Sequence, residues 1–580
     1  MKHIKSLLLV TLLGASFTSC NDFLNLDPLN DIVLENFWTD KSDVESAVLG
    51  IYEALAQGDC VKRMVIWGEI RSDNYIEGER TNEDIRQLLH ENLIYTNSYC
   101  KYLAFYNVIN RANTVLHYAP TVAEKDPNYL YDELLAHEAE AITLRCLSYW
   151  YLIRTFHDVP YVLEPSIDNE GGKDKFYVPQ SSFEEILDTL IKDLEYVKRY
   201  AVNKYANEAS NSGRITKSSI CALLADMYLW RGRADDWDKC IAVCEEVIAL
   251  KRADYDKIKG KQGQLSDLKL FNGYPLISDS WDEDYLGNAF SEIFGSGNSF
   301  ESIFELPYTI DVKNPVNGFF INRQFGTNFG ELKITNRIGD GFSGSGNEVF
   351  EQPLDNRYYH NVLTLSNDAT SYAPGKFITS SIDVYISGGS IDLSSQSVRG
   401  ENSAQCNWMI YRFSEVLLFE AEAYIAKAQI AGDGTADATT YKTKAFNLID
   451  AVNKRAIGYD NEKIAKTSPK TLKVMGITES STPEQLLELL LKERRREFLL
   501  EGKRWYDLVR ISRREGNQER LLRAISSRHD GAIFQAIKIK LKNPYYMYFP
   551  LAKDELRNSN GTLKQNPAYK DDEKVEQASH

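Results

Sequence analysis

The chain has 580 residues, of which 43% are hydrophobic, 26% charged and 12% aromatic. These fractions are typical of a globular protein and exclude a disordered or collagen-like chain. The net charge of −16, without a long basic run, argues against non-specific binding to nucleic acid. Beyond residue 20, no apolar run approaches the roughly 18 residues that a membrane-spanning helix needs.

Residues 1–20 have the layout of a secretory signal rather than of a folded element. Lys2 and Lys5 precede a short apolar stretch, which leads to Cys20. This layout is typical of a secretory signal, and one that ends in cysteine resembles the signal of a bacterial lipoprotein, although Phe17 stands where leucine is usual. We predict that Cys20 is lipidated and that its acyl chains anchor the protein to a membrane. Plain secretion, with Cys20 an ordinary residue, is the alternative.

Seven further cysteines remain after removal of the signal. An odd number in so long a chain does not indicate a disulfide framework. Cys240 and Cys244 are four residues apart on a predicted helix, and we predict that they are small buried residues rather than a redox or metal pair. The seven are Cys60, Cys100, Cys146, Cys221, Cys240, Cys244 and Cys406.

Helical periodicity dominates the chain from residue 41 to about 250. Apolar residues recur there at three- and four-residue spacing, and Ser, Thr or Asp residues cap several of the starts. Pro120, Pro160 and Pro179 are predicted to separate the segments. The predicted helices are Val44–Leu55, Tyr102–Leu116, Leu134–Phe156, Phe183–Val197, Ile215–Trp230 and Trp237–Leu250.

A weak internal repeat runs through these helices. Ala225 and Tyr228 precede a short break and a second helix, and Ala421 and Tyr424 do the same further along. The small residue admits a neighbouring helix and the tyrosine fills the groove. This pattern resembles tetratricopeptide-type hairpins, with 134–156 and 183–197 as a third pair, although a plain helical bundle explains it nearly as well.

Residues 251–410 differ, because no long helical period appears there. Short strands are predicted at 331–335 and 382–386. An insertion of this length without long helices is usually functional. Helices resume at Tyr411–Ala428, Tyr441–Arg455 and Pro483–Arg514, and residues 571–580 are predicted to be a disordered tail.

The run Lys492–Arg510 first suggests a basic patch, but acidic residues interleave with its arginines. Glu493, Glu497 and Glu501 follow one another at one-turn spacing, which allows pairing with neighbouring arginines. Because the same run carries a broad apolar face, we predict a buried, salt-bridged helix pair that is broken at Gly502.

The polar stretch 69–80 and the nearby Tyr99 combine residue types that bind sugars. An aromatic ring stacks on the C–H face of a sugar, while Asp, Asn and Arg bond its hydroxyl groups. A solvated loop is the competing interpretation. No His pair at metal-ligand spacing, P-loop or nucleophile motif is found, so no metal, cofactor or catalytic residue is predicted. The predicted ligand contacts are Asp73, Asn74, Arg80 and Tyr99, together with Trp281 and Tyr285 from the insertion.

Several separated blocks resemble the SusD/RagB family of outer-membrane lipoproteins. They follow the family's order over nearly the whole mature chain. His157 and Ala568 stand where glycine is usual. The blocks are 19–28, Phe37-Trp38, 43–52, 106–113, 138–160, 411–423, 493–508, and 548–550 with Glu555, Asn558, Leu563 and 565–569.

The resemblance implies a mainly α, monomeric fold, in which tetratricopeptide-like hairpins form a right-handed scaffold with a loop-rich variable insertion. It divides the chain into a signal (1–20), an N-terminal helical scaffold (21–250), the variable region (251–410), a C-terminal helical region (411–570) and the tail. The family's ligand residues lie in variable loops and do not transfer by motif.

The resemblance also implies a function. A lipid-anchored protein on the cell surface captures an oligosaccharide or starch-like glycan and delivers it to a SusC-like TonB-dependent β-barrel transporter, without catalysis. A peptide ligand, as in RagB-type relatives, is the first alternative. A surface glycosidase and a scaffold that binds only proteins are the others.

Overall fold

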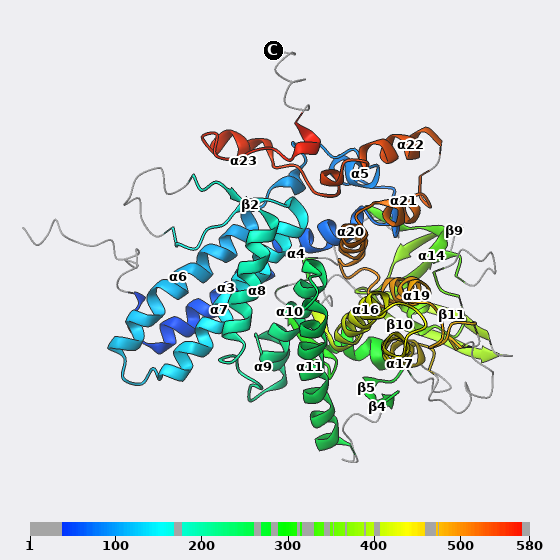
Figure 1. Ribbon diagram of the computed structural model, residues 1–580, viewed down its shortest axis with the longest axis horizontal. Coiled ribbons are helices and arrows are strands. Elements are labelled where there is room, and N and C mark those ends of the chain that lie inside the picture. The colour runs from blue at the N-terminus through cyan, green and yellow to red at the C-terminus, as the bar shows by residue number, and fades with distance from the viewer. Residues whose placement is uncertain are drawn as a thin grey trace, which may run out of the picture.

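The computed structural model shows a mainly helical protein with small sheets (Figure 1). Cys20, the rest of the predicted signal and the tail 571–580 lie outside the described residues. The structure describes residues 37–166, 177–259, 268–279, 288–309, 312, 314–315, 330–341, 349–351, 353–365, 368–387, 390–398, 406–458, 471–473, 475–529 and 531–570.

The six helices predicted before residue 251 are confirmed. Shorter helices that the periodicity did not predict lie between them, namely α4 (Gly58–Val65), α5 (Glu83–Leu89) and α9 (Glu208–Gly213). The six are α3 (Lys41–Ala56), α6 (Leu103–Lys125), α7 (Tyr131–Phe156), α8 (Phe183–Val197), α10 (Lys217–Arg231) and α11 (Asp236–Ile258).

Consecutive helices pack as hairpins, as the repeat predicts. The three predicted pairs are α7 with α8, α10 with α11, and α16 (Phe413–Ala431) with α17 (Ala436–Ala456), and α6 also packs on α7. Small residues allow close packing, since the Cys240 thiol lies 3.7 Å from the Ala225 carbonyl and 3.9 Å from that of Phe419. The seven described cysteines are buried free thiols, as expected for small core residues.

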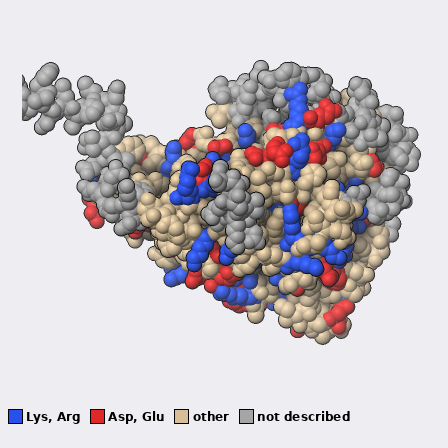
Figure 2. Space-filling model, turned by 90° about the horizontal axis from the view of Figure 1, so that it is seen from above, with Lys and Arg blue, Asp and Glu red and all other residues tan. Residues whose placement is uncertain are grey.

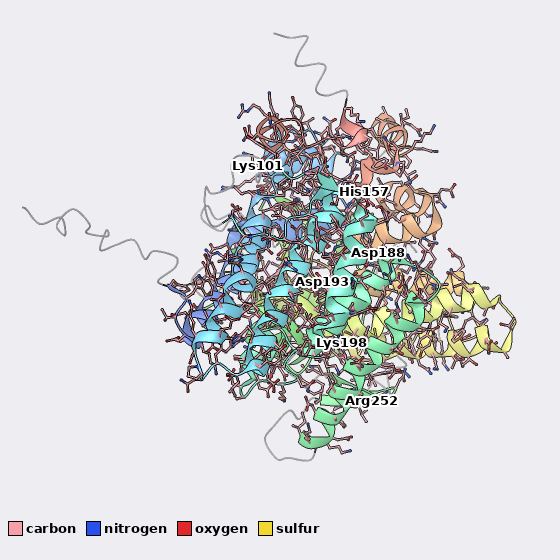
Figure 3. The ribbon with its side chains drawn as sticks, turned by 60° about the vertical axis from the view of Figure 1, so that its left-hand side comes forward. Lys101, His157, Asp188, Asp193, Lys198 and Arg252 are labelled. Atoms are coloured by element: carbon pink, nitrogen blue, oxygen red, sulfur yellow. The ribbon has the colours of Figure 1, made fainter. Side chains whose placement is uncertain are left out.

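Ion pairs join α8 to the helices beside it (Figure 3). Asp188 pairs with Arg231 at 3.0 Å, Asp193 lies 3.6 Å from Arg145 on α7, and Lys198 reaches Glu246 on α11. The contacts of Asp188 and Lys198 connect neighbouring hairpins, and that of Asp193 joins the two helices of one hairpin.

Two backbone details differ from simple sequence rules. Pro120 does not separate helices, because α6 continues through it to Lys125; packing against α7 over this length outweighs the lost backbone hydrogen bond. His157, where the family has glycine, has a φ of 71° at the end of α7. That left-handed conformation favours glycine, and stacking on Phe183 at 5.4 Å accompanies it here.

The variable region contains short strands, as predicted. The strand predicted at 331–335 is β7 (Leu332–Ile334), which pairs with β1 (Tyr75–Glu77) and so joins the insertion to the scaffold. The strand predicted at 382–386 lies in β10 (Thr379–Ser387), paired with β11 (Ser390–Val398). With β8 (Val362–Leu365) and β9 (Asp368–Pro374), strands β1 and β7 form a four-stranded sheet in the order β1-β7-β9-β8.

The remaining elements of the insertion are short. The short elements are β4 (Leu268–Phe271), β5 (Tyr274–Ile277), α12 (Asn288–Phe290), the π-helical segment η5 (Ser291–Ser296), β6 (Ser302–Leu306), α14 (Asn336–Gly339), α15 (Asn356–Asn361), β8 (Val362–Leu365), β9 (Asp368–Pro374) and β12 (Trp408–Arg412). Strand β6 pairs with β12 and so connects the insertion to the C-terminal helical region.

The predicted buried helix pair is α19 (Pro483–Glu497) and α20 (Arg504–Glu515), separated around Gly502 as expected. Gly502 has a φ of 71°, and an added Cβ would lie 2.6 Å from the Met64 carbonyl. Glu69 accepts from the backbone N–H groups of Lys503 and Arg504 at 3.0 and 3.3 Å, at the start of α20. Further helices are α21 (Glu519–Ile525), α22 (Gly531–Lys540) and α23 (Lys553–Asn558).

The glutamates of this helix pair bind residues far away in sequence. Glu497 pairs with Arg357, Arg412 and Arg455, and Glu501 pairs with Arg412 and Lys376. Local pairing occurs as well, with Arg494 on Asp507 at 2.8 Å. The ion network therefore fastens the variable region and β12 to α19.

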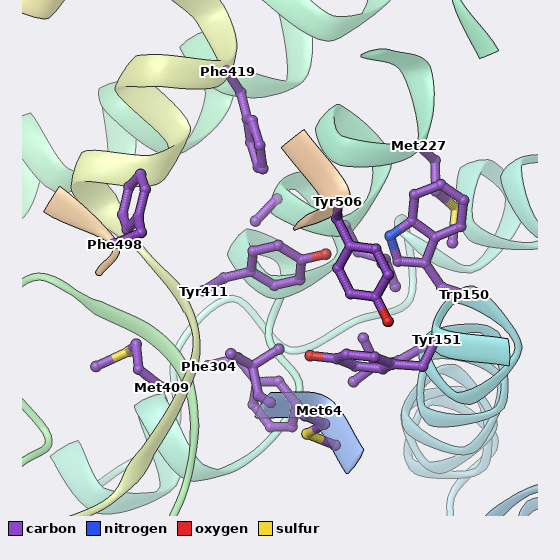
Figure 4. Close-up of a cluster of buried hydrophobic side chains, with 14 of the residues drawn as sticks. Met64, Trp150, Tyr151, Met227, Phe304, Met409, Tyr411, Phe419, Phe498 and Tyr506 are labelled. Atoms are coloured by element: carbon purple, nitrogen blue, oxygen red, sulfur yellow. The ribbon is translucent and has the colours of Figure 1, made fainter. Parts of the chain in front are cut away.

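An aromatic cluster surrounds another buried charge (Figure 4). Asp226 on α10 accepts from Trp150 Nε1 at 2.9 Å and from the Tyr411 hydroxyl at 3.0 Å, and it pairs with Arg154 at 3.2 Å. The Arg154 guanidinium lies 4.1 Å from the ring centroid of Tyr506. Helices α7, α10 and α20 and strand β12 thus meet around one carboxylate rather than around apolar groups alone.

Candidate functional site

Asp73 lies in the turn between the π-helical segment η2 (Ile66–Ile70) and β1, and its carboxylate faces two arginines. Arg504 Nε donates to it at 2.9 Å, and Arg495 lies 3.0 Å away. Burial by itself would raise the pKa of Asp73, but the two guanidinium groups hold that pKa well below its usual range. The carboxylate is therefore ionised and both of its oxygens are engaged.

Asn74 is fully buried beside it. Its Nδ2 donates to Glu69 at 2.7 Å, and its Oδ1 accepts from Arg495 Nε at 2.8 Å. Asn74 thus orients Arg495 and holds η2 against α19. The structure gives Asp73 and Asn74 these packing roles, and their contact with a ligand stays a prediction.

Arg80 and Tyr99, the other two contacts predicted from the N-terminal part, lie on different elements. Arg80 is half-buried in the turn after β1. Tyr99 is half-buried on the 3-10 segment η3 (Ser98–Cys100), 5.9 Å from the Arg63 guanidinium, and burial raises the pKa of its hydroxyl to about 12. Neither residue lines the two cavities that follow. Trp281 and Tyr285 lie outside the described residues.

A cavity of about 250 Å³, which we call the arginine cavity, has Asp73 in its wall. It lies between α14, α19, α20 and α21. Its acidic residues are Asp73 and Glu488, and Leu491, Leu508 and Ala524 contribute apolar surface. Its basic residues are Arg337, Lys492, Arg495, Arg504, Arg520 and Arg523.

A larger cavity of about 680 Å³ lies where α9 and α11 meet the segment 292–303, and we call it the hydroxyl-lined cavity. Three basic and three acidic side chains line it, so their charges cancel, and the Phe300 ring adds an aromatic surface. Its hydroxyl and amide groups belong to Asn203, Asn211, Ser212, Thr216, Ser218, Ser296, Asn298, Ser299 and Ser302.

Specific contacts hold the walls of the hydroxyl-lined cavity together. The Ser212 hydroxyl on α9 donates to Asn298 Oδ1 at 2.6 Å. Gly297, with a φ of 67°, ends η5 and turns the chain toward Asn298. Lys251 on α11 donates to the carbonyl of Ser302 at 3.1 Å and to that of Phe300, and burial lowers its pKa to about 8.

Half of the hydroxyl-lined cavity was not predicted from the sequence. The variable region was predicted to be functional, and one wall comes from that region. The other wall comes from residues 203–218, which are rich in Asn and Ser. That composition is a usable signal, but a polar connection between helices has the same one, and only the fold brings 203–218 opposite Asn298.

The cavity volume and lining suit a small polar molecule, since ligand pockets measure about 300–1,000 Å³ and use a few placed polar groups. Within the described ranges, no group of three or more His, Cys, Asp or Glu side chains is placed to hold a metal ion. No helix among those residues is long and apolar enough to cross a membrane.

These features define a mainly α-helical scaffold with an inserted loop-rich region, and solved structures share it. The chain superposes on NanU of B. fragilis with a TM-score of 0.61 at 19% identity, covering 94% of this chain and 100% of that one. A structure named laminarin binding SusD-like protein gives a TM-score of 0.58 at 20% identity, covering 92% and 100%.

Sequence comparisons agree with the structural ones. A family model described as "SusD family" matches residues 336–569, and one described as "Starch-binding associating with outer membrane" matches 22–229. SusD-like protein P38 of Formosa agariphila is 24% identical over 532 residues, covering 88% of this chain and 92% of that protein. A SusD-like protein of Bacteroides ovatus is 25% identical over 532 residues, covering 87% and 82%. The chain belongs to the SusD/RagB family.

Proposed function

We propose that the protein is a cell-surface, outer-membrane lipoprotein that binds oligosaccharides in the hydroxyl-lined cavity and delivers them, without catalysis, to a SusC-like TonB-dependent transporter. The observation that carries this proposal is a charge-balanced cavity rich in hydroxyl and amide groups in a SusD/RagB chain. Solved relatives include a laminarin binding protein and a surface glycan-binding protein.

The cavity matches the chemistry of a neutral sugar. Hydroxyl and amide side chains both donate and accept, as sugar hydroxyl groups do, and Phe300 offers a face for the C–H groups of a ring. Each such hydrogen bond contributes about 1 kcal/mol net and each ring contact about 0.5–1.5 kcal/mol. The resulting modest affinity suits a protein that must release its ligand to a transporter.

Anchoring and delivery rest on the sequence and the family. Acylation of Cys20 would hold the protein at the outer membrane, and mass spectrometry of the mature N-terminus tests it directly. Co-purification of a β-barrel transporter with the protein tests the partnership. A mature N-terminus without lipid would contradict the anchoring.

Isothermal titration of the detergent-purified protein with maltoheptaose, laminarihexaose and xylohexaose tests the site. For the oligosaccharide that binds, we predict that Phe300→Ala raises Kd about three- to tenfold, because a stacking surface is lost. Tyr196→Ala, which removes an aromatic side chain that is 54% exposed on α8, is the matched control and should leave Kd unchanged.

Two further variants sharpen the same titration. Asn203→Ala removes an exposed amide from the cavity wall, and Trp281→Ala tests the contact predicted from sequence. An unchanged Kd in both Phe300→Ala and Asn203→Ala, with folding intact by circular dichroism, would contradict the proposed site. Binding of peptides but of no oligosaccharide would indicate that the protein takes up peptides instead of sugars.

A further inference from the structure

The arginine cavity holds more positive charge than its surroundings neutralise. Arg520 is balanced by Glu484, Glu488 and Glu515. Arg495 and Arg504, by contrast, share the single carboxylate of Asp73. Figure 2 shows one face of the molecule, on which basic and acidic side chains are interspersed.

Arg337 adds a third guanidinium to the same cavity. It is exposed on α14, and within the part of the chain that the structure describes its guanidinium has no hydrogen-bond or ion-pair partner. Burial lowers the pKa of Arg495 to about 10, and the positive charges of Arg504 and Arg337 act in the same direction. Three guanidinium groups therefore line one cavity together with the Asp73 carboxylate.

We propose that the arginine cavity binds an oxyanion substituent, a carboxylate or a sulfate ester, of an acidic oligosaccharide. That the anion is carried by a sugar rests on the proposed function, whereas the anion site itself rests on Arg337, Arg495 and Arg504. Arg337 presents a planar fork of N–H groups that fits either oxyanion in bidentate fashion. Arg495 and Arg504, which already donate to Asp73, contribute positive charge.

The shape of the cavity agrees with a sugar-borne anion. Its volume of about 250 Å³ exceeds what a small inorganic ion needs, and Leu491, Leu508 and Ala524 provide apolar surface for the C–H groups of a ring. The substituent would face the arginines while the ring lies on the apolar side. This site is separate from the hydroxyl-lined cavity, since the two share no lining residue.

Titration of the full, detergent-purified protein tests the proposal with three kinds of probe: neutral laminarihexaose, oligogalacturonate as the carboxylate, and κ-carrageenan oligosaccharide as the sulfate ester. We expect at least one acidic probe to bind, more weakly at 200 mM than at 50 mM salt. Arg337→Gln should raise its Kd about tenfold at low salt and leave the melting temperature unchanged. Arg557→Gln, which removes an arginine that is 71% exposed on α23, should change neither.

The outcomes separate this inference from the proposed function. Binding of neutral but of no acidic oligosaccharide would overturn the inference alone. An acidic probe whose Kd is the same in Arg337→Gln would overturn it as well. Inorganic sulfate that binds as tightly as the acidic oligosaccharide would show a site for free anions and overturn the assignment to a sugar. If no oligosaccharide of either kind binds, both the inference and the proposed function fail. If Phe300→Ala weakens only neutral probes and Arg337→Gln only acidic ones, both stand.

Discussion

The hydroxyl-lined cavity balances three basic with three acidic side chains, whereas the arginine cavity sets six basic against two acidic ones. Both belong to a chain whose net charge is −16. The difference arises from packing. In the arginine cavity α19, α20 and α21 bring their basic side chains together. Glu484, Glu488 and Glu515 pair with Arg520 there, whereas Glu497 pairs with Arg412 in the ion network. Net charge therefore does not indicate which ligand a given cavity favours.

The two cavities also differ in what holds their walls. A buried carboxylate between two guanidinium groups fixes the arginine cavity, whereas the hydroxyl-lined cavity is held by hydrogen bonds from Ser212 and Lys251 and by one glycine turn, without a buried ion pair among them. Removing one partner of a buried ion pair costs more than removing a neutral hydrogen bond. The following changes test this comparison, beginning with the largest expected effect.

Asp73→Ala should lower the free energy of unfolding by about 3–5 kcal/mol, because it leaves Arg495 and Arg504 buried without their carboxylate. Urea denaturation followed by circular dichroism measures this. Asp554→Ala, in an ion pair that is 51% exposed at the aspartate, should change stability by less than about 0.5 kcal/mol. A loss below about 1 kcal/mol for Asp73→Ala would show that the buried guanidinium groups do not need Asp73 as their counter-ion. The proposed difference between the two cavities would then be wrong.

Gly297→Ala should cost about 2–3 kcal/mol, because alanine disfavours the left-handed backbone and its Cβ would lie 2.4 Å from Asn407 Nδ2. Differential scanning calorimetry measures the loss, and titration should show weaker binding of the neutral oligosaccharide. Gly476→Ala has a similar φ of 81° with no described atom within 4 Å of its Cβ, so it should cost only about 1 kcal/mol. Equal losses in the two variants would remove the special role of the Gly297 turn.

Lys251→Met should change how stability depends on pH, by on the order of 1 kcal/mol. Burial lowers the pKa of Lys251 to about 8 from 10.5, so between these values the unfolded state holds a proton that the folded state lacks. The contribution of Lys251 to the free energy of unfolding therefore rises with pH across that window and is lost as the pH falls through 8.

Urea titrations at pH 7, 8, 9 and 10 should show that rise in the unmodified protein and a smaller one in Lys251→Met. Lys376, whose pKa burial also lowers to about 8, remains in both proteins and cancels in the difference. Lys473→Met, at a lysine that is 56% exposed, should keep the full rise. Parallel curves for Lys251→Met and the unmodified protein would show that Lys251 is not desolvated.

Local pattern was enough to locate the six long helices before residue 251 and the two strands at 331–335 and 382–386, but not the short helices α4, α5 and α9. Apolar spacing and capping residues act within one or two turns, so the sequence carries them directly. It also indicated the buried helix pair around Gly502. Pro120 was predicted to separate two segments, and this prediction was wrong. The packing of α6 on α7, which no local pattern shows, extends the helix past Pro120.

Partners distant in sequence were not predictable in this way. The spacing of Glu497 and Glu501 suggested pairing within their own helix, yet Arg412 lies 85 and 89 positions away from them and binds both. Asp73 and Asn74 have the residue types of a sugar site, but their partners are the nearby Glu69 and two arginines, Arg495 and Arg504, that lie more than 400 positions away. Which acid neutralises which base depends on the arrangement of whole elements.

The amino-acid sequence alone determined the helical hairpins, the loop-rich insertion and the family, because periodicity, capping and ordered motifs are written in consecutive residues. The tertiary structure decided where cavities form and which charge each one carries. A cavity is made by side chains from several segments, and its electrostatic character follows from distances that only the folded chain fixes.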